Sequence, residues 1–107
     1  MASKNAFGVF REEAPEAARA FDQLIGALSE STALDDKMRQ LIYIGIKASR
    51  GEAGAVAAHV PMAKQAGATR EEIRDTIVMT LTVCGVTGVT QCLVPALDAY
   101  DAALLPA

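Results

Sequence analysis

His59 is the single histidine of this 107-residue chain and the first residue to consider for chemistry. An unperturbed imidazole has a pKa near 6.5, so it can act as a general acid or base at neutral pH. One histidine excludes a His-rich metal site and any mechanism that needs two imidazoles within one subunit. The alternative is a structural role, in which His59 bonds a backbone carbonyl that Pro61 leaves without its helical donor.

Glu52 is the second ionisable candidate, because it precedes His59 by seven residues. On a helix this spacing puts both side chains on one face, separated by two turns or about 10 Å. They are too far apart to bond each other, but they could flank a small ligand lying over Ala55 and Val56. The alternative is that Glu52 simply favours the positive N-terminus of its helix.

The two thiols, Cys84 and Cys92, do not form a Cys-x-x-Cys motif and have no nearby cation in sequence to lower their pKa. We expect both to be small core residues. Redox use of this pair is the alternative. No phosphate-binding loop, Ser-His-Asp pattern, or zinc or calcium motif accompanies them.

The elements that position these residues are predicted to be helices in one domain over residues 1–107. The chain is 51% hydrophobic but only 5% aromatic, so small aliphatic residues must build the core, which favours closely packed helices. A net charge of -3 argues against nucleic-acid binding, and the apolar content argues against disorder. Residues 1–10 have no secretory signal, which predicts a cytoplasmic protein with reduced thiols.

Periodicity and capping residues predict five helices, over about residues 12–28, 36–50, 52–66, 69–84 and 88–105. Asp35 is a natural N-cap and Gly51 a natural stop, while Thr69 and Glu72 form a capping box. The second helix is apolar nearly all round, which suggests that it is buried partly against another subunit.

The uncharged stretch over residues 76–94 is open to other interpretations. Its content of Val, Ile and Thr would also suit two buried strands that turn at Gly85 to Gly88. Its length approaches that of a membrane span, but its Thr, Gly and Gln residues and its acidic flanks argue against one. The capping box just upstream favours helix, so no membrane contact is expected.

The order of several motifs is similar to that of a known family. A helix led by Leu34-Asp35-Asp36-Lys37-Met38-Arg39-Gln40-Leu41-Ile42 is followed by His59, and then by Ala63-x-x-Ala66-Gly67-Ala68-Thr69-x-Glu71-Glu72-Ile73 and an apolar helix. Over about residues 21–104 this arrangement resembles the carboxymuconolactone decarboxylase family, which shares its fold with the alkylhydroperoxidase D-like proteins. The resemblance implies an all-α subunit of five to six helices, assembly into trimers or hexamers, and a small pocket near subunit contacts.

The redox motif of that fold is absent here. Counting back from His59 places Ala55 at the second cysteine of the motif, Glu52 at the first, and Gln40 at its glutamate. Only the histidine is kept, and a thiol peroxidase cannot work without its thiols. Peroxidase activity is therefore not expected at this site.

The decarboxylase branch implies that the protein opens and decarboxylates a cyclic lactone acid without metal or organic cofactor. His59 and Glu52 are the catalytic candidates, and Gln40 and Ala55 are the substrate-binding candidates. That branch usually has a glutamate where Ala55 stands, so the substrate need not be carboxymuconolactone itself. The reaction needs a proton donor for a developing carbanion and a group that holds the carboxylate.

Three hypotheses follow for function. The first is a cofactor-free enzyme acting on a lactone or related carboxylated small molecule at a His59-centred pocket. The second is a non-catalytic ligand-binding or scaffold oligomer that has lost its chemistry along with the motif thiols. The third is a thiol antioxidant that uses Cys84 and Cys92.

Overall fold

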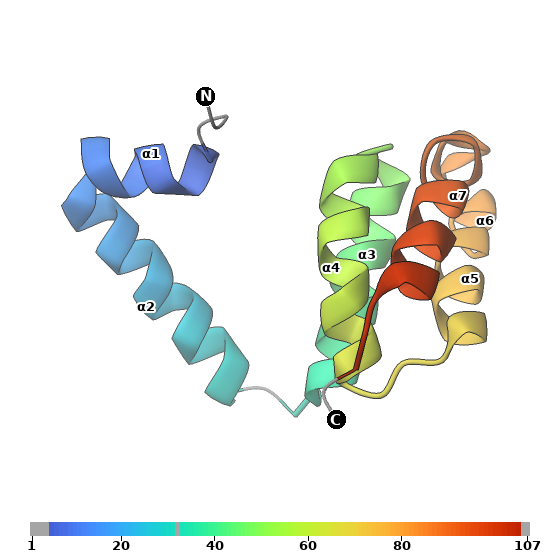
Figure 1. Ribbon diagram of the computed structural model, residues 1–107, viewed down its shortest axis with the longest axis horizontal. Helices are drawn as coiled ribbons and strands as arrows, with labels where there is room; N and C mark the ends of the chain where they lie inside the picture. Colours follow the sequence, from blue (N-terminus) through green and yellow to red (C-terminus); the bar gives the residue numbers. More distant parts are fainter. Residues whose placement is uncertain (1–4, 32, 106–107) are drawn as a thin grey trace. The chain divides into compact units, whose positions relative to one another are not determined.

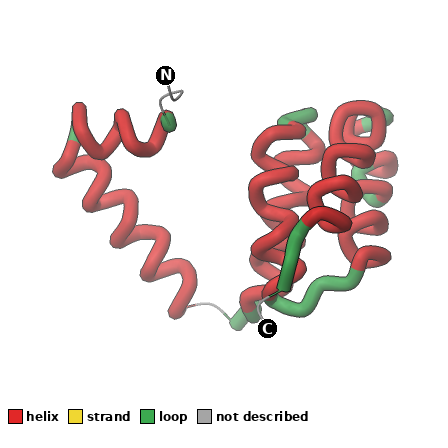
Figure 2. Tube along the Cα trace, in the orientation of Figure 1, coloured by secondary structure: helices red, strands yellow, loops and turns green. Residues whose placement is uncertain are grey.

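The computed structural model describes residues 5–31 and 33–105, and these are helical with no strand among them (Figures 1 and 2). The predicted all-α class is thereby confirmed. Backbone contacts divide the chain into two compact units, Met1–Ala33 and Leu34–Ala107. The helices are α1 (Ala6–Glu13), α2 (Pro15–Ser31), α3 (Asp36–Ser49), α4 (Ala53–Gln65), α5 (Arg70–Val78), α6 (Leu81–Cys84) and α7 (Thr87–Ala102).

The first unit contains two helices where the sequence analysis predicted one over residues 12–28. The prediction was wrong because Ala14 leaves the helical conformation, with φ -139° and ψ 66°. The residue before a proline is disfavoured in the α region, so α1 ends there and Pro15 opens α2. Asn5 caps α1 by accepting a hydrogen bond of 2.9 Å from the backbone N–H of Phe7.

The second unit is a ring of four helices around a core of small and branched aliphatic side chains. Contacts join α3 to α4, α4 to α7, α7 to α5 and α5 to α3. The core is formed by ten buried residues: Ile44, Ala48, Val56, Val60, Ala63, Ala68, Ile73, Ile77, Cys92 and Ala96. Because α3 and α4 are neighbours in this ring, residues on their facing sides can form a joint site.

The ends of the site-bearing helices match the predicted caps. Asp35 accepts a 2.8 Å hydrogen bond from the N–H of Met38 at the start of α3. Gly51, with φ +70°, follows the end of α3 in a conformation that side-chain-bearing residues rarely adopt. Thr69 and Glu72 form the complete capping box of α5. The turn at Gly51 forms the short connection that brings α4 back against α3.

Residues 76–94 form helices joined by two short turns and contain no strand, so the alternative of two buried strands is wrong. The predicted helix over residues 69–84 is nevertheless interrupted, since α5 ends at Val78 and α6 begins at Leu81. At this interruption the backbone of α7 approaches closely: a Cβ on Gly88 would lie 3.1 Å from the carbonyl oxygen of Ala48 and would collide with the Thr80 side chain. Among helices of the described ranges, none has the length and apolarity that a membrane span requires.

Candidate functional site

His59 lies on α4 against one face of α3. Its Nδ1 is 2.9 Å from Oε1 of Gln40, and its ring stacks on Tyr43 with ring centroids 3.7 Å apart and planes 24° from parallel. Gln40, Tyr43 and Lys47 share this face of α3 because their spacings of three and four residues approximate one helical turn. We call these four residues, together with Glu52, the His59 cluster.

The contact with Gln40 determines how His59 can exchange a proton. An amide oxygen only accepts hydrogen bonds, so the Nδ1–H of His59 donates to Gln40. This bond can form whether the imidazole is neutral or charged. Nε2 is therefore the atom through which His59 would exchange a proton with a ligand.

The surroundings of His59 favour its neutral form. Burial of the ring is the larger influence that lowers the pKa of His59 below its ordinary value of 6.5, and the charge of Lys47 is the second. The Lys47 ammonium lies 5.8 Å from the centre of the Tyr43 ring, the ring that stacks on His59. At neutral pH the cluster thus holds an uncharged imidazole beside a cation.

Glu52 reaches this site through Lys47, not by facing His59 along a continuous helix. It occupies the N-cap position of α4, with ψ 75°, and its side chain makes no capping bond. Its Oε1 lies 3.3 Å from Nζ of Lys47, and its Oε2 lies 3.1 Å from Nε of Arg50. The Oε2 contact is an ion pair without hydrogen-bond geometry, so this buried oxygen has no hydrogen-bond donor.

Of the four residues predicted from the sequence, the structure joins Gln40 directly to His59 and joins Glu52 to Lys47. Ala55 is half-buried on α4 beside the fully buried Val56 and offers no polar side-chain atom. The sequence analysis did not place Tyr43 or Lys47 in the site. Their spacing from Gln40 predicts that all three residues share one face of α3. The sequence alone does not show that this face meets α4.

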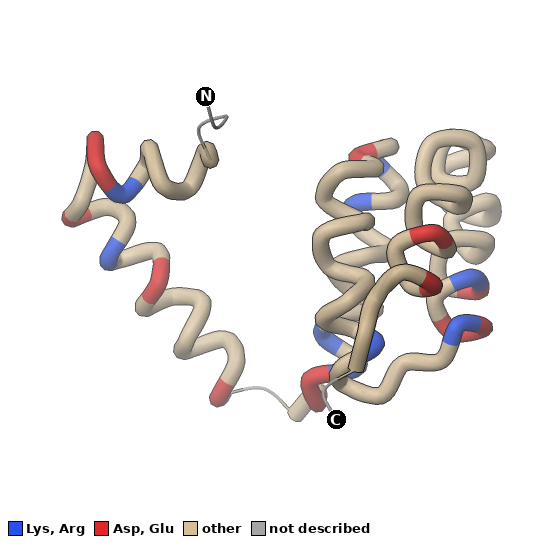
Figure 3. The backbone as a smooth tube through the Cα atoms, in the orientation of Figure 1, with Lys and Arg blue, Asp and Glu red and all other residues tan. Residues whose placement is uncertain are grey.

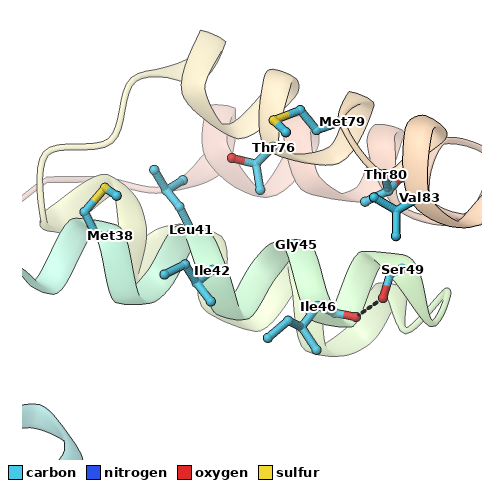
Figure 4. Close-up of a pocket in the computed structure, with 10 residues that line it drawn as sticks. All are labelled: Met38, Leu41, Ile42, Gly45, Ile46, Ser49, Thr76, Met79, Thr80 and Val83. Atoms are coloured by element: carbon cyan, nitrogen blue, oxygen red, sulfur yellow. Dashed lines mark hydrogen bonds between the residues drawn. The ribbon is translucent and has the colours of Figure 1, made fainter. Parts of the chain in front are cut away.

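A separate apolar groove of about 450 Å³ lies between α3, α5 and α6 (Figure 4). At about 100° per residue, its α3 residues point to the side opposite Gln40, Tyr43 and Lys47. His59 does not line the groove, whose walls are formed by Met38, Leu41, Ile42, Gly45, Ile46, Ser49, Thr76, Met79, Thr80 and Val83.

The groove contains no ionisable side chain, and its hydroxyl groups are already used as donors. Ser49 donates to the carbonyl of Ile46 at 2.6 Å, as Figure 4 shows, and Thr76 donates to that of Glu72 at 2.7 Å. Thr80 donates to the carbonyl of Ile77 at 2.6 Å. The groove thus suits an apolar occupant and lacks groups for acid–base chemistry.

The two thiols lie in different environments. The prediction that Cys84 is a core residue was wrong: Cys84 is exposed on the short helix α6, where its thiol donates to the carbonyl of Thr80 at 3.3 Å. Cys92 is buried as predicted, and burial raises its pKa. A raised pKa disfavours the thiolate that redox chemistry needs. Across residues 5–31 and 33–105, no group of three His, Cys, Asp or Glu side chains is placed to hold a metal ion.

Comparison with known proteins places this fold and sequence in one family. The sequence profile of the Carboxymuconolactone decarboxylase family matches residues 15–98. A carboxymuconolactone decarboxylase family protein from Legionella pneumophila is 29% identical, with a TM-score of 0.77 over 88% of this chain and 83% of that chain. A proposed carboxymuconolactone decarboxylase from Burkholderia xenovorans LB400 has the same fold, with a TM-score of 0.83 over 94% of this chain and 78% of that one, at 21% identity.

No curated protein matches the sequence. The profile nevertheless spans most of the chain, from the start of α2 into α7, and includes every residue of the His59 cluster. The solved structures show the same helical fold. The chain belongs to the carboxymuconolactone decarboxylase family.

Proposed function

We propose that this protein is a cofactor-free enzyme that removes a carboxylate from a small lactone, with His59 as the proton-exchanging residue. One observation carries the proposal: the only histidine is held in place by a bond to Gln40 and by stacking on Tyr43. Family membership supports the class of reaction. Glu52 is assigned to the site as the partner of Lys47, and Ala55 to its wall.

The chemistry proposed for this site has two steps. The bond between the ring carbon and the carboxylate breaks, CO₂ leaves, and the electron pair passes into the conjugated lactone carbonyl. The imidazolium of His59, which is the minor form of the free protein at neutral pH, then donates its Nε2 proton to carbon and regains a proton from water. A lowered pKa makes this imidazolium a stronger acid, which favours transfer to carbon.

The experiment that tests this proposal is an assay of the full chain with unsaturated five-membered lactones that carry a carboxylate on the ring. We expect release of CO₂ and a decarboxylated lactone, detected by proton NMR, without added metal or cofactor. Saturated lactones with the carboxylate on the carbon that bears the ring oxygen are the matched control. Without the ring double bond, the electron pair left on that carbon cannot be delocalised into the carbonyl, so these compounds should not react. No CO₂ release from any unsaturated probe would contradict the proposal.

A second candidate function is a non-catalytic ligand-binding or scaffold protein. It is favoured by the apolar groove, which lies on the other face of α3 from His59 and has no acid or base. This candidate predicts ligand binding that is unchanged in His59→Gln, together with no turnover. Turnover that depends on His59 would rule it out.

Assembly into trimers or hexamers and a cytoplasmic location belong to the same proposal. Exposed aliphatic side chains on α3, such as Ile42 at 44% and Ile46 at 56% exposure, support self-association. Light scattering coupled to gel filtration should give three or six times the mass of the 107-residue chain. A monomer over the concentration range of the activity assay would contradict this part of the proposal.

A further inference from the structure

We infer that Lys47 is the anion-binding residue of the His59 cluster and that it holds the carboxylate of a small anionic ligand. The inference rests on the proposed function for the location of the site. It goes further by naming the recognition group, which neither the sequence motifs nor the family comparison assigns.

The position of Lys47 is the first argument. Its ammonium lies 3.3 Å from Oε1 of Glu52 on one side and 5.8 Å from the centre of the Tyr43 ring on the other. Tyr43 in turn stacks on His59. Lys47, whose charge lowers the pKa of His59, therefore contacts one carboxylate and one aromatic face. Its ammonium has three N–H donors, so it can also bind a ligand.

The balance of charge is the second argument. Lys47 and Arg50 contribute two positive charges and Glu52 contributes one negative charge, so these groups sum to +1 in a chain whose net charge is -3. Lys47 and Arg50 both lie at the C-terminal end of α3. Figure 3 shows basic and acidic residues together where the chain turns from α3 into α4. One small monoanion would neutralise the excess.

Lys47 is a better anchor for that anion than Arg50. The Arg50 side chain is 67% exposed, so water screens its charge, whereas the Lys47 side chain is 26% exposed. Lys47 is also the group whose charge reaches His59 strongly enough to affect its pKa. An anion on Lys47 would therefore be both attracted and adjacent to the proton-exchanging residue.

Binding at Lys47 would also prepare His59 for its role. The negative charge of a bound carboxylate offsets the charge of Lys47 at His59 and thereby raises the pKa of His59. By reciprocity, protonation of His59 must tighten carboxylate binding. Several charged or titratable groups of the surrounding helices are engaged elsewhere. Lys64 of α4 donates to the carbonyls of Tyr100 and Ala103, the Tyr100 hydroxyl of α7 donates to the carbonyl of Ala68, and Asp101 pairs with Arg70.

The single histidine makes this inference directly measurable. In the full chain, the ring resonances of His59 can be titrated by NMR without overlap from another imidazole. The probes are 5-oxotetrahydrofuran-2-carboxylate and γ-butyrolactone, which lacks the carboxylate. We expect the carboxylate probe to raise the pKa of His59 and the neutral lactone to leave it unchanged.

Lys47→Met should raise the pKa of His59 in the free protein, weaken binding of the carboxylate probe by about tenfold or more, and abolish the ligand-induced shift. Lys37→Met is the matched control, because Lys37 also lies on α3 and pairs with Glu72 at 3.1 Å with a similar exposure of 32%. It should keep the wild-type response. Lys47→Arg retains the charge and should restore part of the binding.

A Lys47→Met protein that folds, by circular dichroism, and still binds the carboxylate probe as tightly as wild type would overturn the inference. So would a neutral lactone that shifts the His59 titration as much as its carboxylate counterpart. The proposed function fails separately: carboxylate binding through Lys47 without any CO₂ release would remove the enzyme assignment and leave the anion site. CO₂ release that does not depend on Lys47 would keep the enzyme assignment and remove the anion site.

Discussion

Replacing His59 with glutamine is expected to lower kcat for lactone decarboxylation by about 100-fold to 10,000-fold, the range that a positioned general acid contributes. Glutamine keeps a polar side chain of similar reach at this position, but it cannot carry a proton to carbon. The bond that His59 makes with Gln40 and its stacking on Tyr43 fix the orientation of the imidazole, as this proposed role requires. Steady-state kinetics with an unsaturated lactone acid provide the measurement.

The control for this substitution is the folded state of the variant. His59 is only half-buried, so His59→Gln should retain the helical circular dichroism spectrum and the mass of the wild-type assembly. A correctly assembled His59→Gln protein with wild-type kcat would refute the assignment of His59 as the proton donor.

If His59 is the proton donor, the direction in which activity changes with pH can be predicted. A proton donor is active in its charged form, so kcat/KM should fall as pH rises through the pKa of His59 in the free protein, which lies below 6.5. If bound carboxylate raises this pKa, kcat should fall at a higher pH than kcat/KM does. Profiles of both parameters between pH 4.5 and about 8 would reveal the offset, and a rise in activity with pH would mean that His59 acts as a base.

Replacing Ile77 with alanine is expected to lower the free energy of unfolding by about 2–5 kcal/mol, as for other large-to-small changes in a packed core. Ile77 is 0% exposed on α5 and belongs to the core shared by α3, α4, α5 and α7. Its loss removes buried methyl groups and leaves a cavity in the ring that holds α3 against α4. Urea unfolding followed by circular dichroism measures the change.

Val78→Ala is the matched control, since Val78 is the next residue of α5 and is 38% exposed. This change should cost less than about 1 kcal/mol, because little apolar area is buried there. Equal losses for the two variants would mean that the ring does not form the stability core. A loss at Ile77 should also weaken activity at elevated temperature, because the His59 cluster depends on the pairing of α3 and α4.

Local sequence chemistry predicted much of the fold correctly. Asp35, Gly51 and the Thr69–Glu72 capping box mark helix ends where the structure has them, because capping depends on residues close in the chain. The predicted helix boundaries are wrong where a following proline or a helix distant in sequence determines the end of a helix. Ala14 breaks the first helix because Pro15 follows it, and the close approach of Gly88 to Thr80 accompanies the break between α5 and α6.

The site was predictable only in part, for a similar reason. His59 was named as the single histidine of the chain and Gln40 through the family resemblance, and the structure brings them to 2.9 Å. Tyr43 and Lys47 could not be assigned, because periodicity shows which residues share a face of a helix but not what that face meets. Exposure of Cys84 likewise depends on the short helix α6, which no sequence signal separated from α5.

Mapping by NMR where a lactone acid binds the full chain tests whether the His59 cluster is the ligand site. The His59 cluster and the apolar groove lie on opposite faces of α3, so their signals distinguish the two sites. We predict that the ligand shifts the His59 ring and the Gln40 side-chain amide, while the methyl groups of Ile42 and Met79 keep their positions. Shifts confined to the groove methyl groups, with His59 unaffected, would contradict the account and leave His59 as a packing residue.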